Sequence, residues 1–98
     1  MQTLTPPRSF LTLDIETLGL MHHKPLPPIT CICLFDGTTR YEYLLYGVTP
    51  DVYDTNKKAI LQLLDDAERL AGYNAILFDL PYIAMEMGVD DDRLAAWR

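Results

Sequence analysis

Two acidic residues stand two positions apart in an otherwise apolar stretch, FLTLDIETLGL, at residues 10–20. In an extended strand, residues two positions apart point to the same face, so Asp14 and Glu16 would lie side by side and repel each other. A divalent cation between them relieves this repulsion, and carboxylate oxygens prefer hard cations such as Mg²⁺ and Mn²⁺. The spacing therefore indicates a metal site, while acids on a half-exposed strand are also common without one.

The elements that must position these acids begin with three predicted strands. Residues 9–16 alternate in character, with Asp14 and Glu16 on one face and Leu11, Leu13 and Ile15 on the other. A proline-rich loop follows, and then two β-rich runs, ITCICLF at 29–35 and YEYLLYG at 41–47. The Asp36-Gly37 pair between them is typical of a turn, which predicts an antiparallel hairpin.

The second half of the sequence predicts helices around a fourth strand. Apolar residues recur at helical spacing from Ile60 to Leu70, which predicts a helix capped by Asp54 or Thr55 and ended by Gly72. LAGYNAIL, residues 70–77, predicts a short strand or extended passage. A second helix is expected from Asp79 to Gly88, and DDDRLAAWR, residues 90–98, begins a third.

This order predicts a mixed α/β fold. Three antiparallel strands are followed by a crossover helix and by a parallel fourth strand beside the first. The helix after that strand would bring Asp79 towards Asp14 and Glu16. An N-cap of the helix is a second interpretation of Asp79, and both roles are compatible.

Two motifs resemble those of a known family. LDIETLG, residues 13–19, is similar to the first motif of the DEDD superfamily of 3′–5′ exonucleases, which have a ribonuclease H-like fold. GYNAILFDLPYI, residues 72–83, resembles the second motif, especially that of the proofreading exonuclease domains of family B DNA polymerases. The resemblance extends over residues 10–87 and is carried by these two motifs.

The resemblance implies a catalytic site that uses two Mg²⁺ or Mn²⁺ ions. It implies that Asp14 bridges the ions, that Glu16 binds the ion that activates water, and that Asp79 supports the second ion through water. Such ions hydrolyse a phosphodiester bond at a nucleic-acid 3′ end. The likeness to proofreading domains favours DNA as the substrate.

The resemblance also implies residues that contact the substrate. Asn74 and Phe78 would position the terminal nucleotide and the adjoining loop, and Leu18 would be an apolar wedge near the terminal base. For Asn74, a turn residue tolerant of unusual backbone angles is an equal alternative.

The family's third motif, Tyr-x₃-Asp or His-x₄-Asp, is missing. The acids after Gly88 are Asp90, Asp91 and Asp92, which suit a solvated helix cap, and no Tyr or His precedes them at the required spacing. We therefore expect residues 1–98 to form a single, incomplete ribonuclease H-like domain that lacks its last strand and helix. Its activity in isolation is expected to be weak or absent. The chain would be a fragment, one of two polypeptides that complete the fold, or an inactive module that binds a protein or nucleic acid.

Four further residues allow a different metal site. Cys31, Cys33, His22 and His23 could be combined as a Cys₂His₂ zinc site. The cysteines alternate with Ile32 and Leu34, however, as in a buried strand, so core cysteines are the favoured interpretation. The histidines lie in the proline-rich loop and are expected to face solvent, or to touch a substrate phosphate.

Composition limits the class of protein. The net charge is −6 with eight Lys and Arg, which argues against a broad nucleic-acid surface. Tyr41, Tyr43 and Tyr46 could stack on single-stranded bases, but strand packing is the more ordinary role. No apolar run approaches the roughly 20 residues of a membrane span, and no leader is evident. With its closely spaced cysteines, the chain is expected in the cytoplasm or nucleus, without membrane contact.

Overall fold

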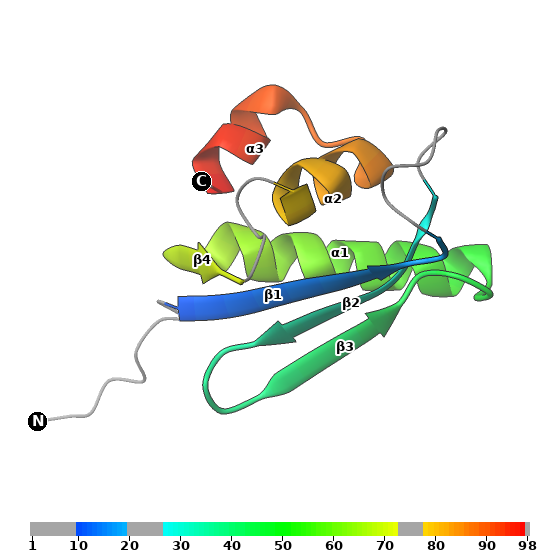
Figure 1. Cartoon of the computed structure of the whole chain (residues 1–98), viewed down its shortest axis with the longest axis horizontal. Coiled ribbons are helices and arrows are strands. Elements are labelled where there is room, and N and C mark those ends of the chain that lie inside the picture. The colour runs from blue at the N-terminus through cyan, green and yellow to red at the C-terminus, as the bar shows by residue number, and fades with distance from the viewer. Residues whose placement is uncertain (1–9, 20–26, 73–77, 98) are drawn as a thin grey trace, which may run out of the picture.

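The computed structural model describes residues 10–19, 27–72 and 78–97, which form four strands and three helices in the order β1-β2-β3-α1-β4-α2-α3 (Figure 1). The strands are β1 (Phe10–Thr17), β2 (Ile29–Phe35), β3 (Arg40–Leu44) and β4 (Arg69–Ala71). The helices are α1 (Pro50–Asp66), α2 (Leu80–Met87) and α3 (Asp91–Trp97). None of these helices combines the length and the apolar character needed to cross a bilayer.

The strands form one mixed sheet in the order β3-β2-β1-β4. β1 pairs antiparallel with β2, and β2 pairs antiparallel with β3, whereas β4 runs parallel to β1. The predicted mixed α/β architecture, with three antiparallel strands and a parallel fourth strand beside the first, is confirmed. A parallel neighbour requires a crossover, and α1 provides it between β3 and β4.

The core lies between the sheet and the helices. β1 contributes alternate residues, Leu11, Leu13 and Ile15, all of which are buried. The other strands and the helices add residues that are also fully buried: Ile29, Ile32, Leu34, Ile60, Leu64, Leu80 and Ile83. Because strand residues alternate between the two faces, burial of this set leaves the intervening residues on the opposite side.

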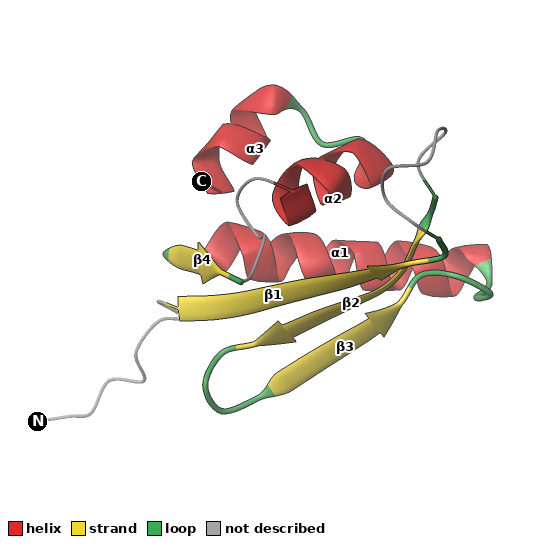
Figure 2. Cartoon of the chain, viewed as in Figure 1, coloured by secondary structure: helices red, strands yellow, loops and turns green. Residues whose placement is uncertain are grey.

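That opposite side, called the open face below, carries the polar residues of the strands. The strand pairing places Asp14 opposite Cys33 and Glu16 opposite Cys31, and Cys33 lies opposite Glu42 of β3. β1, β2 and β3 lie in front of α1 in Figure 2, and no described element is drawn over them. The open face therefore gathers side chains from three strands on an uncovered surface.

The turn between β2 and β3 forms as its sequence predicts. The Asp36 Oδ1 atom accepts hydrogen bonds from the backbone N–H groups of Thr38 (2.9 Å) and Thr39 (2.7 Å). Gly37 has φ +96°, a left-handed value that glycine adopts without steric cost. β3 ends at Leu44 rather than at residue 47, so it is shorter than predicted.

The start of α1 was predicted wrongly. The helix begins one turn before Asp54, at Pro50, and its N-cap is Thr49. The Thr49 hydroxyl oxygen accepts a hydrogen bond from the Val52 N–H at 3.2 Å. Proline lacks a backbone N–H group, but at the first helical position this removes no hydrogen bond, because an N–H group there has no partner within the helix.

The end of α1 also differs from the prediction. The helix stops at Asp66, and Ala67 is already extended. Leu70, expected on the helix, instead pairs with Leu11 of β1. The free energy gained by pairing residues 69–71 with β1 therefore outweighs that of extending the helix, which ends six residues before Gly72. Helical spacing alone does not predict this end point.

Three hydrogen bonds join α2 to α1, to β2 and to the segment before β2. Glu86 Oε2 accepts a hydrogen bond from the Tyr53 hydroxyl at 2.9 Å, and its Oε1 accepts one from the Ile29 N–H at 3.3 Å. The Tyr82 hydroxyl donates to the Pro27 carbonyl oxygen. The helix ends at Gly88, as predicted, with φ +69°. These contacts set where the first turn of α2 lies.

The third helix forms as predicted and is joined to α1 by Asp65. The Asp65 carboxylate accepts hydrogen bonds from Arg93 Nε (3.1 Å) and Nη2 (2.5 Å), and from Trp97 Nε1 (2.8 Å). The Arg93 guanidinium lowers the pKa of Asp65 below its ordinary value of 3.8, with a further contribution from the Trp97 N–H.

We predict that this carboxylate stabilises the fold most at neutral pH. Because its pKa is lower in the folded state, the contribution is complete above the ordinary value of 3.8 and is lost as pH falls through the folded pKa. Asp65→Asn should reduce the free energy of unfolding by about 1 kcal/mol at pH 7, a modest value because the pair is partly exposed. Urea unfolding from pH 7 to pH 2 measures this, with Glu68→Gln as an exposed control. A loss that is equal at pH 7 and pH 2 would contradict it.

Candidate metal site on the open sheet face

Asp14 and Glu16 lie on the open face of β1, both exposed, as the alternation of the strand predicts. Asp79 lies immediately before α2 and is only 5% exposed. Burial raises the pKa of the Asp79 carboxyl above its ordinary value, and the negative charge of Asp14 raises it further. The fold therefore brings Asp79 within electrostatic range of Asp14, although the two are distant in sequence. In the described part of the chain, however, the carboxylate oxygens of Asp14, Glu16 and Asp79 do not gather within 4.8 Å of one another.

The carboxylate of Asp79 does not cap the helix that follows it. Asp79 occupies the N-cap position, but its backbone is already helical (φ −67°, ψ −46°) and its side chain makes no capping hydrogen bond. Within residues 10–19, 27–72 and 78–97, no group donates a hydrogen bond to this carboxylate. A buried carboxylate without donors is costly, and the helix N-terminus offsets only part of the cost. A bound cation would offset this cost, which the described protein groups do not.

A shallow hollow of about 240 Å³ opens on the same face. Its polar lining includes Asp14, Glu16 and Arg40. Arg40 forms an exposed ion pair with Glu42 at 3.4 Å, which leaves the guanidinium free to exchange partners because such surface pairs are weak. Acids that suit a hard cation and a guanidinium that suits a phosphate therefore border one hollow.

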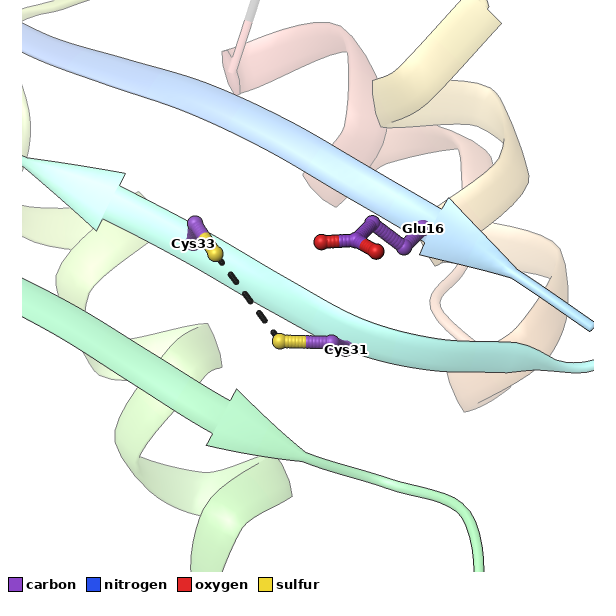
Figure 3. A group of neighbouring side chains, drawn as sticks. All are labelled: Glu16, Cys31 and Cys33. Atoms are coloured by element: carbon purple, nitrogen blue, oxygen red, sulfur yellow. Dashed lines mark hydrogen bonds between the residues drawn. The ribbon is translucent and has the colours of Figure 1, made fainter.

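The cysteines also lie on this face, so their interpretation as core residues is right about the burial of Cys31 but wrong about Cys33. Ile32 and Leu34 belong to the core cluster, whereas Cys31 and Cys33, which alternate with them, do not. Cys31 is buried and Cys33 half-buried, and both are free thiols. Ligand atoms of Glu16, Cys31 and Cys33 all lie within 4.8 Å of one another (Figure 3).

The thiols interact with each other and with a carboxylate. The two Sγ atoms are 3.8 Å apart, and Cys33 Sγ donates a hydrogen bond to Glu42 Oε2 at 3.5 Å. Burial, followed by the hydrogen bond to Cys31, raises the pKa of Cys33 to about 12. Burial also raises the pKa of Cys31. Without a cation, both thiols are therefore protonated at neutral pH.

The other sequence-predicted residues are placed as follows. Leu18 and Phe78 are exposed, as residues that contact a substrate must be. Asn74, His22 and His23 lie outside the described residues. Tyr41 and Tyr43 pack against the core, in agreement with strand packing, and Tyr46 is exposed.

Sequence reasoning did not identify Arg40 and Glu42, nor the approach of the cysteines to Glu16. The sequence feature that could have indicated this approach is the Cys-x-Cys run on one strand and the Asp-x-Glu run on its neighbour. The two runs predict a shared site only when the register between the strands is known. No protein-family model matches the chain, and no curated protein matches it in sequence.

We predict that Asp79 destabilises the metal-free protein. Its folded pKa lies above the ordinary value of 3.8, so the free energy of unfolding should decline as pH rises from 3.8 through the folded pKa, and stay lower above it. Asp79→Asn should abolish the decline and should be more stable than the wild type at pH 7 in EDTA.

Thermal unfolding from pH 3 to pH 8 measures this effect, with the exposed Asp92→Asn as a control. Saturating Mn²⁺ should then stabilise the wild type more than Asp79→Asn, because a ligand stabilises the state that binds it. An Asp79→Asn protein that is less stable than the wild type in EDTA would show that the carboxylate is satisfied by protein groups.

Proposed function

We propose that this chain contributes the metal-binding carboxylates of a ribonuclease H-like, DEDD-type 3′–5′ exonuclease domain, which hydrolyses phosphodiester bonds at nucleic-acid 3′ ends, with DNA favoured. One observation carries the proposal. The buried Asp79 carboxylate, without a hydrogen-bond donor among the described residues, lies within electrostatic range of Asp14 on a neighbouring element. The motifs around these two residues are the ones that resemble the family.

The donor set fits hard divalent cations. Asp14, Glu16 and Asp79 offer only carboxylate oxygens, which Mg²⁺ and Mn²⁺ prefer. Bound ions of this kind lower the pKa of an attacking water and stabilise the leaving 3′ oxygen. The three acids contribute half of the formal net charge of −6, so bound cations would reduce the repulsion of a nucleic acid.

The chain's own residues would position the substrate. The Arg40 guanidinium borders the hollow that Asp14 and Glu16 line, where it can contact a non-bridging phosphate oxygen. Leu18 and Phe78 are exposed apolar side chains that would contact the terminal base, and Asn74 is proposed for the same region. The chain has few Lys and Arg side chains, so binding of the nucleic acid would depend on the metal ions rather than on a basic surface.

The fourth carboxylate of the family pattern must come from elsewhere. No Tyr-x₃-Asp or His-x₄-Asp motif follows Gly88 in the 98 residues. The open face, on which Asp14 and Glu16 lie, is not covered by any described element. A segment or a second polypeptide that covers this face could supply both the missing carboxylate and the residue that orients the water.

A second candidate is an inactive module that binds a partner. Phe10, Phe35 and Leu44 are exposed apolar residues on the strands of the open face, a surface that a partner could cover. Retention of metal binding by the three carboxylates distinguishes the two candidates, because a purely structural partner surface does not require it.

We predict that the chain binds Mn²⁺ through the three carboxylates. Asp14→Asn and Asp79→Asn should each weaken Mn²⁺ affinity by about tenfold or more, since even the loss of groups that only orient a metal ligand costs about 10- to 100-fold. Mn²⁺ electron paramagnetic resonance measures the free ion during titration. Asp92→Asn, an exposed acid of α3, serves as a matched control. Equal affinity in all four proteins would remove the basis for the nuclease proposal.

We also predict how the chain treats an oligonucleotide. With Mn²⁺, it should bind single-stranded DNA that has a free 3′ hydroxyl, and Asp14→Asn should abolish this binding. Digestion from the 3′ end should be weak or absent, because the fourth carboxylate is lacking. Fluorescence anisotropy and denaturing gels with DNA labelled at the 5′ end measure both properties. Robust digestion that Asp14→Asn abolishes would show that the 98 residues suffice, and binding that survives Asp14→Asn would contradict the assigned site.

A further inference from the structure

Glu16 belongs to two groups of ligand atoms on the open face. One is the carboxylate site proposed above, and the other, the group whose ligand atoms the fold itself brings together, combines Glu16 with the thiols of Cys31 and Cys33. We propose that Cys31, Cys33 and Glu16 form a second metal site, which binds a thiophilic divalent cation, Zn²⁺. This site uses sulfur ligands, which the hard cations of the carboxylate site do not favour.

The separation of the two sulfur atoms fits a single zinc ion. Two thiolates bound at about 2.3 Å to a tetrahedral Zn²⁺ lie about 3.8 Å apart. Cys31 Sγ and Cys33 Sγ are 3.8 Å apart in the absence of any ion. The pair would therefore bind Zn²⁺ without a change in the spacing of the sulfur atoms. A disulfide, in contrast, requires the sulfur atoms to approach to about 2.05 Å.

Carboxylates lie where further zinc ligands are needed. The Glu16 carboxylate extends from β1 towards the two sulfur atoms of β2 in Figure 3, and its ligand atom lies within 4.8 Å of both. Glu42 Oε2 lies 3.5 Å from Cys33 Sγ. A sulfur and an oxygen ligand of one tetrahedral zinc ion are also about 3.5 Å apart. Glu42 or water would complete the four-coordinate shell.

The strands hold these ligands in place. Cys31 and Cys33 are two positions apart on one strand, so both side chains point to the open face. The antiparallel register places Glu16 directly opposite Cys31, and Glu42 directly opposite Cys33. Ligands on paired strands are more rigidly positioned than ligands on loops, which reduces the entropy lost on binding.

Metal binding at this site exchanges protons for the ion. Two S–Zn bonds form, the two S–H bonds break, and the two protons pass to solvent. No change of oxidation state is needed. The affinity should consequently rise with pH.

The shared Glu16 makes the two metal sites compete for one ligand, a consequence that depends on the proposed function. A Glu16 carboxylate that is turned to the thiolates is withdrawn from the ions that Asp14 and Asp79 would hold. Zn²⁺ at the thiolates would therefore remove a ligand from the proposed nuclease site, so that Zn²⁺ acts as an inhibitor through Cys31 and Cys33.

Co²⁺ is the direct probe of the thiolate site, because thiolate ligation gives a charge-transfer band in the near ultraviolet. The reduced wild-type chain should show this band at one equivalent of Co²⁺, and one equivalent of Zn²⁺ should remove it. Cys31→Ser/Cys33→Ser should lack the band and should lose Zn²⁺ affinity by about 100-fold or more. Asp14→Asn and Asp79→Asn, which alter only the carboxylate site, should retain the band.

Circular dichroism establishes that each variant is folded, and Cys33→Ala provides a milder replacement if the double variant unfolds. A folded wild type without the band, or zinc binding that persists in the folded cysteine variant, would overturn the thiolate site.

Mn²⁺ titration with and without one equivalent of Zn²⁺ then tests the sharing of Glu16. Mn²⁺ affinity should fall about tenfold in the wild type and stay unchanged in the cysteine variant. Equal Mn²⁺ affinity with and without Zn²⁺ would overturn the sharing. Absence of Mn²⁺ binding even without Zn²⁺ would contradict the nuclease proposal and leave the cobalt result standing.

Discussion

Burial of the apolar face of β1 is the constraint on which the rest of the structure depends. Leu11, Leu13 and Ile15 all lie in the core cluster, so β1 can have only one orientation relative to the helices. A slip of one residue would exchange the faces, exposing this apolar set and burying Asp14 and Glu16. The free-energy cost of burying two carboxylates without partners therefore keeps the acids on the open face. Because β2 pairs in register with β1, and β3 with β2, the other ligand groups of this face are placed with them.

Negative charge then accumulates on a surface that the fold leaves uncovered. Asp14, Glu16 and Glu42 all belong to the strands of the open face, and Arg40 is the cation that borders the same hollow. Asp79 adds a carboxylate that is buried rather than solvated. Such a concentration of like charges lowers the stability of the metal-free protein, so binding of the proposed cations would raise it and would link metal affinity to folding.

The sequence predicts features that depend on local pattern and misses those that depend on pairing. β2 was predicted at its observed bounds because β-rich residues are followed directly by an Asp-Gly turn. The start of α1 was missed because Thr49-Pro50 is as good a cap as Asp54. Alternation places Cys31 and Ile32 on opposite faces but does not say which faces the core. That choice is made by tertiary packing, as is the burial of Asp79, so neither could be predicted from spacing.

The length of one side chain explains how the two proposed metal sites could share one ligand. Aspartate has a short side chain, so Asp14 is held close to β1 and serves one site. Glu16 has one more methylene group and is exposed, so its carboxylate can turn along the strand or across it towards Cys31. The free-energy difference between these orientations is small for a solvated side chain and is set mainly by which cation is bound. Selection between a hard and a thiophilic ion at the proposed sites would then require a rotamer change at Glu16, because the paired strands already hold Asp14, Cys31 and Cys33 in place.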